Sequence, residues 1–448
     1  MRKFNTWGKM MKKIAVSAVA AASIVVTANA YEFKPMGYKA TAMGGAGVAS
    51  ARGAYATYYN PALLASSDYG SEFAFGVGLS FGENDVADPI DELSDLNFSE
   101  EMDDIANAIE YDSDDVPASP NLARAQQIIQ GIDKSNGLQL SPALSLGAQL
   151  PYNLGIGLYA SADIRASMVI DQDRTDLFFE YNEGTKYASY NPSTGDVNTT
   201  LGEDDYKASS LEYAIEEGTT YLDAVATVTY ELPIGYAHMF ETQYGLLSVG
   251  GNIKPMRVDS FATQLKLDTE SDDIADELDQ TSKSSTAVTL DLGLLFTEKN
   301  TGIDFGLVGK NLTSPSFDRG GEQGGKIKYD AAYRAGLGYR MFNDRLSLAF
   351  DIDLNEQDTS FDGLSSQYVG GGVEFAPTSW LALRGGMMKN IASDSIDEGL
   401  IYSAGFGAGS KWLQVDLAGM VSSKSGSFDG SSIPRYASVN LSLVSRWW

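Results

Sequence analysis

Apolar and polar residues alternate with a period of two over most of the chain after residue 67. In residues 154–170 every even-numbered position is apolar, while the odd-numbered neighbours include Gly155, Asp163 and Arg165. Successive side chains of a β-strand point to opposite faces, so this period indicates strands with one apolar and one polar face. No stretch beyond residue 67 has the roughly twenty apolar residues of a membrane helix. The alternation therefore predicts an all-β protein.

The same pattern predicts fourteen strands, and their connections alternate in length. Short turns follow the even-numbered strands, and mostly longer, polar loops follow the odd-numbered ones. Turns at one end and long loops at the other are typical of an outer-membrane barrel. We therefore predict a 14-stranded antiparallel transmembrane β-barrel over residues 67–448, with long external loops at 83–137 and 172–220. The predicted strands are 70–82, 138–150, 153–171, 221–236, 244–268, 284–298, 302–312, 329–342, 345–356, 366–376, 379–390, 400–410, 412–423 and 435–448.

The apolar face could point into a soluble core or outward into lipid. A closed barrel leaves no backbone group unpaired, and a bilayer favours apolar side chains on the outside. Residues 1–30 are typical of a signal peptide, with Lys12 and Lys13, an apolar run over 14–26 and small residues at 28–30. Met10 or Met11 would begin a signal peptide of ordinary length, so translation of residues 1–9 stays open. Export and the sorting of loops favour the lipid-facing orientation, in the outer membrane of a Gram-negative cell.

The last predicted strand ends in two aromatic residues. In "YASVNLSLVSRWW", Val439, Leu441, Leu443 and Trp447 share one parity and Trp448 has the other. An aromatic end is usual for the last strand of such barrels, and it serves membrane insertion. Trp447 fits the lipid-facing register, which leaves either a bulge near the end of the strand or an overhanging last residue.

The segment before the first strand, "ATAMGGAGVASARGAYATYYNPALLAS" at residues 40–66, has no lipid-facing pattern. A barrel of about fourteen strands has a lumen too wide for its own wall side chains to fill. Small residues allow tight turns and close backbone approach, and Asn60-Pro61 suits a sharp turn before strand one. We predict that residues 31–66 form a plug in the lumen. The residues assigned to it are Gly44, Gly45, Gly47, Asn60, Pro61 and Ala62.

This segment resembles the N-terminal plug of FadL/TodX-type (OMPP1-like) outer-membrane proteins, which have a Gly-rich run and an Asn-Pro-Ala sequence. "YYNPALLA", "VGKNLTSPSF" and "YRAGLGY" are more similar to the TraF-like barrel proteins attached by name to conjugal-transfer operons. The resemblance implies a fourteen-stranded barrel that gives passive passage to small hydrophobic molecules. The alternative is a structural or assembly role in a conjugal-transfer or other surface apparatus, without transport. An apolar tunnel beside the plug would favour passage, and a lumen of interlocked polar side chains would favour the platform.

The amino-acid composition argues against several other classes of function. The chain has no cysteine and one histidine, His238, which argues against thiolate metal sites, Cys nucleophiles and a His-centred triad. With 60 acidic and 32 basic residues, a basic nucleic-acid surface is not expected. We find no Walker A, GxSxG or HExxH motif, and we predict no enzyme, no metal and no cofactor. The partners we expect are outer-membrane lipid and lipopolysaccharide, the barrel-assembly machinery and a small hydrophobic ligand.

Two further features admit two interpretations each. Gly250, Gly251 and Pro255 weaken strand five, either as a bulge that bends the strand or as a kink that opens a side window. Loop 83–137 has helical spacing in two places, and its 15 acidic residues form either a solvated surface or a Ca²⁺-bridged lid over the pore.

Overall fold

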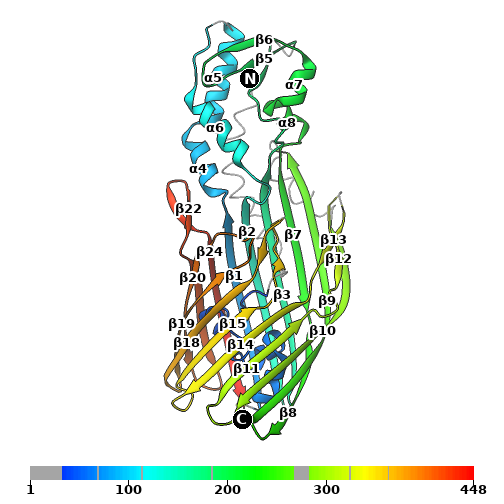
Figure 1. Cartoon of the computed structure of the whole chain (residues 1–448), viewed down its shortest axis with the longest axis vertical. Helices are drawn as coiled ribbons and strands as arrows, with labels where there is room; N and C mark the ends of the chain where they lie inside the picture. The colour runs from blue at the N-terminus through cyan, green and yellow to red at the C-terminus, as the bar shows by residue number, and fades with distance from the viewer. Residues whose placement is uncertain are drawn as a thin grey trace.

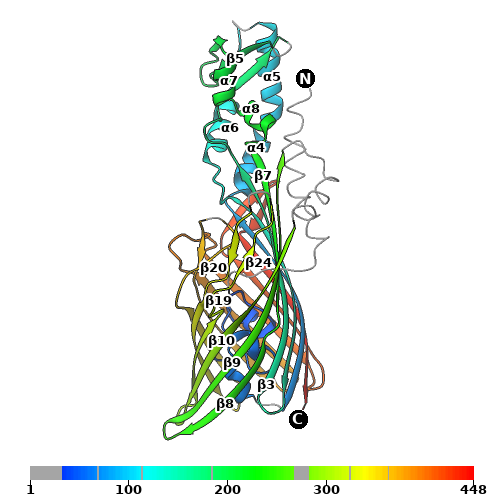
Figure 2. The ribbon, with the colours of Figure 1, turned by 90° about the vertical axis from the view of Figure 1, so that its right-hand side faces the viewer.

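The computed structural model describes residues 33–447, apart from 68–69, 113–114, 183–184, 267–281, 322–323 and 362. The predicted signal peptide and Trp448 lie outside these described residues. The strands form a tall barrel, and a mixed helical and β headpiece stands on one of its rims (Figures 1 and 2). We call this rim the loop end of the barrel and the opposite rim the turn end.

One antiparallel sheet closes on itself to make the barrel. Its β7 (Tyr221–Glu231) and β8 (Ile234–Thr242) share one position between β3 and β9, so fourteen positions complete the circle, and pairing of β1 with β24 closes it. The predicted all-β, 14-stranded barrel is thus confirmed. The other strands are β1 (Ser71–Asn84), β2 (Gly137–Leu150), β3 (Leu154–Val169), β9 (Gly245–Lys266), β10 (Lys283–Glu298), β11 (Ile303–Lys310), β14 (Ala332–Met341), β15 (Leu346–Asp353), β18 (Tyr368–Thr378), β19 (Leu381–Asn390), β20 (Leu400–Gly409), β21 (Gln414–Ser422) and β24 (Tyr436–Trp447).

The fourth position in the wall differs from the prediction. The sequence placed the end of this strand at residue 236 and a turn at 237–243, but β8 continues to Thr242. Its outward side chains Tyr236, His238 and Phe240 stay exposed while Ala237 is buried, so the two-residue period runs on past the predicted end. The strand is instead interrupted at Leu232–Pro233, between β7 and β8.

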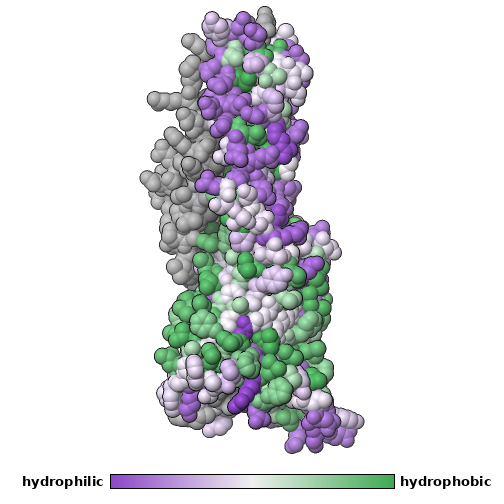
Figure 3. All heavy atoms as spheres, turned by 90° about the vertical axis from the view of Figure 1, so that its left-hand side faces the viewer, coloured by the Kyte–Doolittle hydropathy of each residue, from purple (hydrophilic) through white to green (hydrophobic). Residues whose placement is uncertain are grey.

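Apolar side chains cover the outward face of the barrel. Figure 3 shows hydrophobic residues gathered over the wall and hydrophilic residues over the headpiece. The outward parity of β10, for example, exposes Val288, Leu290, Leu292 and Leu294, whereas the inward parity buries Asp291. Lipid-facing and lumen-facing residues alternate in this way in an outer-membrane barrel.

Exposed aromatic residues ring the turn end. Five short turns and the end of β24 each carry one, and aromatic girdles of this kind mark the membrane interfaces of outer-membrane barrels. Trp412 and Trp447 lie against each other, with ring centroids 5.0 Å apart. The residues of the ring are Tyr152, Tyr244, Phe342, Trp380, Trp412 and Trp447.

The headpiece is built from the two longest loops and has a hydrophobic core of its own. Residues of both loops, such as Ile129 and Phe179, are buried in one cluster with the ends of β3, β7 and β9. No helix among the described residues is long and apolar enough to cross a membrane. The loop over 83–137 holds one helix, α4, beyond the two places with helical spacing. The headpiece elements are α4 (Ala87–Asp95), α5 (Phe98–Tyr111), α6 (Pro120–Gly131), β4 (Phe178–Tyr181), β5 (Lys186–Tyr190), β6 (Val197–Leu201), α7 (Glu203–Ser209) and α8 (Leu211–Glu217).

Residues 33–66, the N-terminal segment, lie inside the barrel toward the turn end (Figure 1). The segment consists of short helical pieces. Its Gly- and Ala-rich sequence has no apolar periodicity that would stabilise a longer helix or a strand. Most of its side chains are buried against the inward face of the wall. Its elements are α2 (Tyr38–Ala42), η1 (Gly53–Tyr55), α3 (Ala56–Tyr59) and η2 (Pro61–Ser66).

The orientation of the wall predicts how a charge on its outward face affects stability. Leu292→Arg places a cation in the middle of the apolar face of β10, so we expect it to lower the free energy of unfolding from lipid vesicles by about 2–4 kcal/mol. Tyr111→Arg, at the 94 % exposed end of α5, should change it by less than about 0.5 kcal/mol. Urea titration of both variants in vesicles measures the difference. Equal effects would contradict a lipid-facing β10.

Candidate functional site

Asn60 is the buried anchor of the N-terminal segment. Its side-chain amide donates to the carbonyls of Val48 and Leu294, each at 3.0 Å, and thereby ties the segment to itself and to the wall strand β10. Its Oδ1 accepts a hydrogen bond from Ala62 N at 3.0 Å, which caps η2, while Pro61 needs no donor at the first position of that helix. The Asn-Pro-Ala sequence thus joins three backbone groups around one turn.

Two wall glycines make room for this turn. A Cβ at Gly293 would collide with Asn60 Oδ1, and a Cβ at Gly250 would lie 2.5 Å from Ala62 N. Both positions face inward, since Asp291 and Asn252 beside them are buried in the lumen. The segment approaches the wall backbone directly because these two residues lack side chains.

The glycines at 44, 45 and 47 of the N-terminal segment also lie close to other groups. Gly44, with φ at +63°, packs against the backbone of β18 and β19, and its N–H donates to Ser403 Oγ at 2.9 Å. The Gly47 and Val48 N–H groups both donate to Asp351 Oδ2, at 2.7 and 2.9 Å. Gly45 also has a positive φ, +79°. The positive φ at Gly44 and Gly45 and the close approach at Gly44 favour residues without a Cβ.

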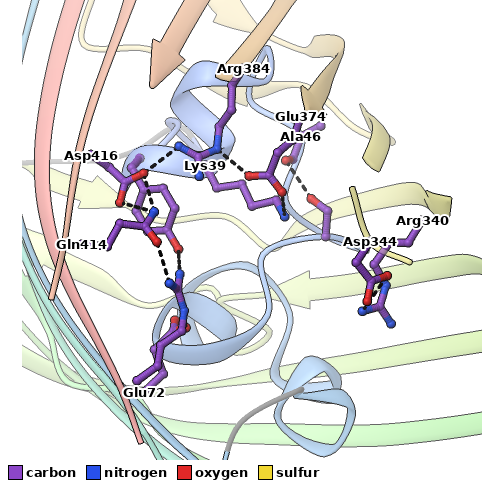
Figure 4. A network of polar contacts seen from close by, with 12 residues as sticks. Lys39, Ala46, Glu72, Arg340, Asp344, Glu374, Arg384, Gln414 and Asp416 are labelled. Carbon is purple, nitrogen blue, oxygen red and sulfur yellow. Dashed lines mark hydrogen bonds and ion pairs between the residues drawn. The ribbon is translucent and has the colours of Figure 1, made fainter. Parts of the chain in front are cut away.

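A chain of buried and half-buried charges joins α2 to the wall on one side of the segment (Figure 4). Lys39 Nζ lies 2.9 Å from Glu374 Oε1, and Arg384 bridges Glu374 at 2.6 Å and Asp416 at 2.7 Å. Arg446 Nε continues the chain at 2.7 Å from Glu72 Oε2. Each charge has an opposite neighbour, which offsets the cost of burial.

Aromatic rings of the N-terminal segment make the contacts on its other side. Phe33 packs against Tyr58 and Tyr59, with ring centroids 5.6 Å away in both cases. The Lys310 ammonium lies 4.1 Å from the centre of the Phe33 ring and 3.9 Å from that of Tyr58, and the Arg334 guanidinium lies 4.0 Å from Phe33. These wall cations reach the segment through ring faces.

Ion pairs, hydrogen bonds and buried apolar clusters join the segment to the wall at the turn end of the lumen. A cavity of about 240 Å³ remains between the segment and the wall, and charged residues such as Lys39, Arg52, Asp304 and Arg446 line it. Arg52 and Asp304 are themselves paired across it. The charged groups give this cavity the chemistry of a site for polar groups.

Apolar hollows lie on the outer face of the wall instead. One of about 410 Å³ and another of about 490 Å³ share Leu158 and Leu232, beside the interruption at Leu232–Pro233. The wall stays hydrogen-bonded there, since Leu232 N donates to Pro255 O and Gly157 N donates to Pro233 O, both at 3.0 Å.

The residues singled out in strand five lie within one continuous strand. β9 pairs with β10 from Gly245 to Ser260 without a shift of register, through Gly250, Gly251 and Pro255. At the C-terminal end of the last strand, Trp447 lies on the outward face. There β24 pairs in register with β1 through Arg446. His238 is exposed on the outward face of β8, where it packs against Phe240.

Sequence reasoning did not single out the wall residues that receive the segment. Asp351, Glu374, Arg384 and Asp416 each lie on the inward parity of a strand that otherwise alternates apolar and small residues. Charge on that parity is the signal that could have identified them, because a charged residue buried in the lumen requires a partner.

The family model described as "F plasmid transfer operon, TraF, protein" matches residues 57–353. No curated protein matches the chain. Among solved structures, the Ralstonia pickettii toluene transporter TbuX is similar at 14 % identity over 94 % of this chain and 100 % of its own, with a TM-score of 0.47. The Pseudomonas putida toluene transporter TodX is similar at 12 % identity over 92 % of this chain and 97 % of its own, also with a TM-score of 0.47.

The close approach at Gly293 predicts a leak. In Gly293→Ala the added methyl group overlaps Asn60 Oδ1, and overpacking of about 1–3 kcal/mol should loosen the segment from β10. Planar-bilayer conductance should rise above that of the parent protein, toward the level of a variant without residues 31–66. Gly385→Ala is the matched control, because the nearest atom to its Cβ is Ser403 O at 3.8 Å. Low conductance in the folded deletion variant would show that the segment does not occlude the lumen.

Proposed function

This chain belongs to the family of the F plasmid transfer operon TraF protein, and we propose that it is a closed outer-membrane barrel that serves as a platform in a surface apparatus of the conjugal-transfer type. In this proposal the N-terminal segment is a plug, and the headpiece is the part that a partner binds. The proposed location is the outer membrane of a Gram-negative cell, where lipid and lipopolysaccharide surround the apolar wall. We also propose that the barrel-assembly machinery inserts the chain.

The observation that carries the proposal is the polar interlock of the lumen. Ion pairs and hydrogen bonds join the segment to the wall over several strands, from Asp304 on β11, paired with Arg52, to Glu72 on β1, which accepts a hydrogen bond from Ala54 N. A hydrophobic solute would have to separate these pairs, and an unpaired buried charge costs several kcal/mol. A platform has no such requirement, because it works with the lumen closed.

The headpiece supports the same proposal. Its hydrophobic core shares no residue with the contacts in the lumen. The headpiece packs on the ends of β3, β7 and β9, and a folded module offers a partner a better defined surface than flexible loops would. Sealing the lumen and binding a partner then fall to separate parts of the chain.

In-cell photo-crosslinking tests the platform. A photo-crosslinking residue at position 111, exposed on α5, should capture a partner in cells that contain the apparatus. The same residue at position 152, exposed in the turn between β2 and β3, is the matched control at the opposite end. The parent protein in proteoliposomes should not accelerate toluene entry. Accelerated, saturable toluene entry with no crosslink at 111 would overturn the proposal.

Passage of a small hydrophobic molecule remains the second candidate, favoured by the interruption at Leu232–Pro233 beside the two apolar hollows. Pro233 has no N–H to donate to Gly157 O, the acceptor that its register places opposite. If solutes leave sideways here, Pro233→Val should restore this bond and lower toluene entry about tenfold, the effect of roughly 1.4 kcal/mol. Pro151→Val, in the exposed turn between β2 and β3, should leave entry unchanged. Equal entry rates in both variants would exclude this route.

A further inference from the structure

Two hairpins fold over the lumen at the loop end. The first, β12 (Ser316–Asp318) with β13 (Lys326–Lys328), buries Phe317 against Met256 and Val258 of β9. The second, β16 (Gln357–Asp358) with β17 (Ser365–Ser366), carries Phe361, which is buried and whose ring would lie 3.1 Å from a Cβ at Gly137. Since this hairpin connects β15 to β18 and Gly137 begins β2, the second hairpin crosses the mouth of the barrel.

The hairpins enclose a cavity of about 370 Å³ against the inward face of β3 and β7, which we call the loop-end vestibule. Among the described residues, its lining holds four cationic side chains and two carboxylates. Hydroxyl and backbone groups of Thr359, Ser360 and Gly363 complete it. The charged residues of the lining are Arg165, Arg319, Lys326, Lys328, Asp163 and Asp358.

From this geometry we infer that the loop-end vestibule binds a small oxyanion, with carboxylate or phosphate groups, through Arg165, Arg319 and Lys328. A cavity of about 370 Å³ lies within the usual range of small-molecule sites, roughly 300–1,000 Å³. The inference does not depend on the proposed platform function. It concerns a cavity at the loop end of the lumen, whereas the network around the N-terminal segment lies at the turn end.

Unused donors in the lining point to an acceptor ligand. Arg165 is only 2 % exposed, and its Nη2 donates to Asp223, yet its Nε has no hydrogen-bond partner among the described residues. The Ser360 Oγ, on the opposite hairpin, is likewise buried without a partner there. Leaving a buried donor unpaired costs about 1–3 kcal/mol, so an oxygen-rich ligand between the hairpin and β3 would remove part of this cost.

One of the two lining carboxylates, and the two lysines, already have partners. Asp163 is already bound by Lys34, Gln139 and Ser141, so its oxygens are engaged. Lys326 and Lys328 form exposed ion pairs with Asp318 and Asp330, at 2.7 and 2.6 Å. Exposed pairs of this kind contribute about 0–1 kcal/mol, so both ammonium groups can turn to a ligand at little cost.

The vestibule also differs from the surface above it. The two longest loops, 83–137 and 172–220, carry 26 acidic and five basic residues. Their repulsion of an anion is screened beyond about 8 Å at physiological ionic strength, whereas the cations of the vestibule act at contact distance. Short-range attraction therefore decides the sign of binding.

Isothermal titration calorimetry of the purified mature protein in detergent tests the inference. Inorganic phosphate and succinate are the two probes, because they separate a phosphate from a carboxylate preference. We expect saturable binding of at least one of them, weakened by added sodium chloride. Arg319→Gln/Lys328→Gln should weaken binding about tenfold or more for each charged donor removed.

The control is Lys299→Gln/Lys411→Gln, which removes two exposed cations at the turn end and leaves the vestibule untouched. Ser360→Ala, which alters no charge, should weaken binding without affecting heat-modifiable migration of the folded barrel. No heat with either probe in the parent protein would overturn the inference. Equal loss of affinity in the two double variants would overturn it as well, because the effect would then be one of net charge.

Discussion

Closure of the backbone hydrogen-bond ladder is the constraint on which the rest of this structure depends. In a bilayer no water is available to an unpaired amide, so the strands pair around the whole circle, from β1 to β24 and back to β1. Closure gives every wall residue one of two environments. Apolar side chains face lipid on the even positions of β10, and Asp291, Gly293 and Thr289 face the lumen on the odd ones.

A closed ladder of fourteen positions creates a second requirement, because polar side chains in its lumen need partners. The N-terminal segment supplies many of them. Lys39, Arg52 and Lys34 each pair with a wall carboxylate, and backbone N–H groups at Gly47 and Val48 bind Asp351. Wall and segment are therefore complementary in charge, and glycines on both sides bring their backbones into contact.

The two ends of the barrel differ in structure. Short turns and an aromatic ring position the turn end at a membrane interface, while the loop end carries a folded headpiece and two hairpins over the mouth. Between them the lumen divides into a charged network around the segment and the loop-end vestibule beneath the hairpins. A partner-binding platform and a small-anion site fit this division, since neither requires an open path through the wall.

The sequence by itself determined the barrel, because a two-residue period and the sorting of loop lengths are local properties that each strand carries alone. It also indicated the lumenal segment, through Asn60-Pro61 and the absence of a lipid-facing pattern before residue 67. Only the tertiary structure decided which residues of the segment, the wall and the hairpins contact each other. Gly293 meets Asn60, Arg384 lies between Glu374 and Asp416, and Phe361 reaches Gly137, so residues of different elements come together. Such pairings depend on curvature and register around the whole circle, which no single strand encodes.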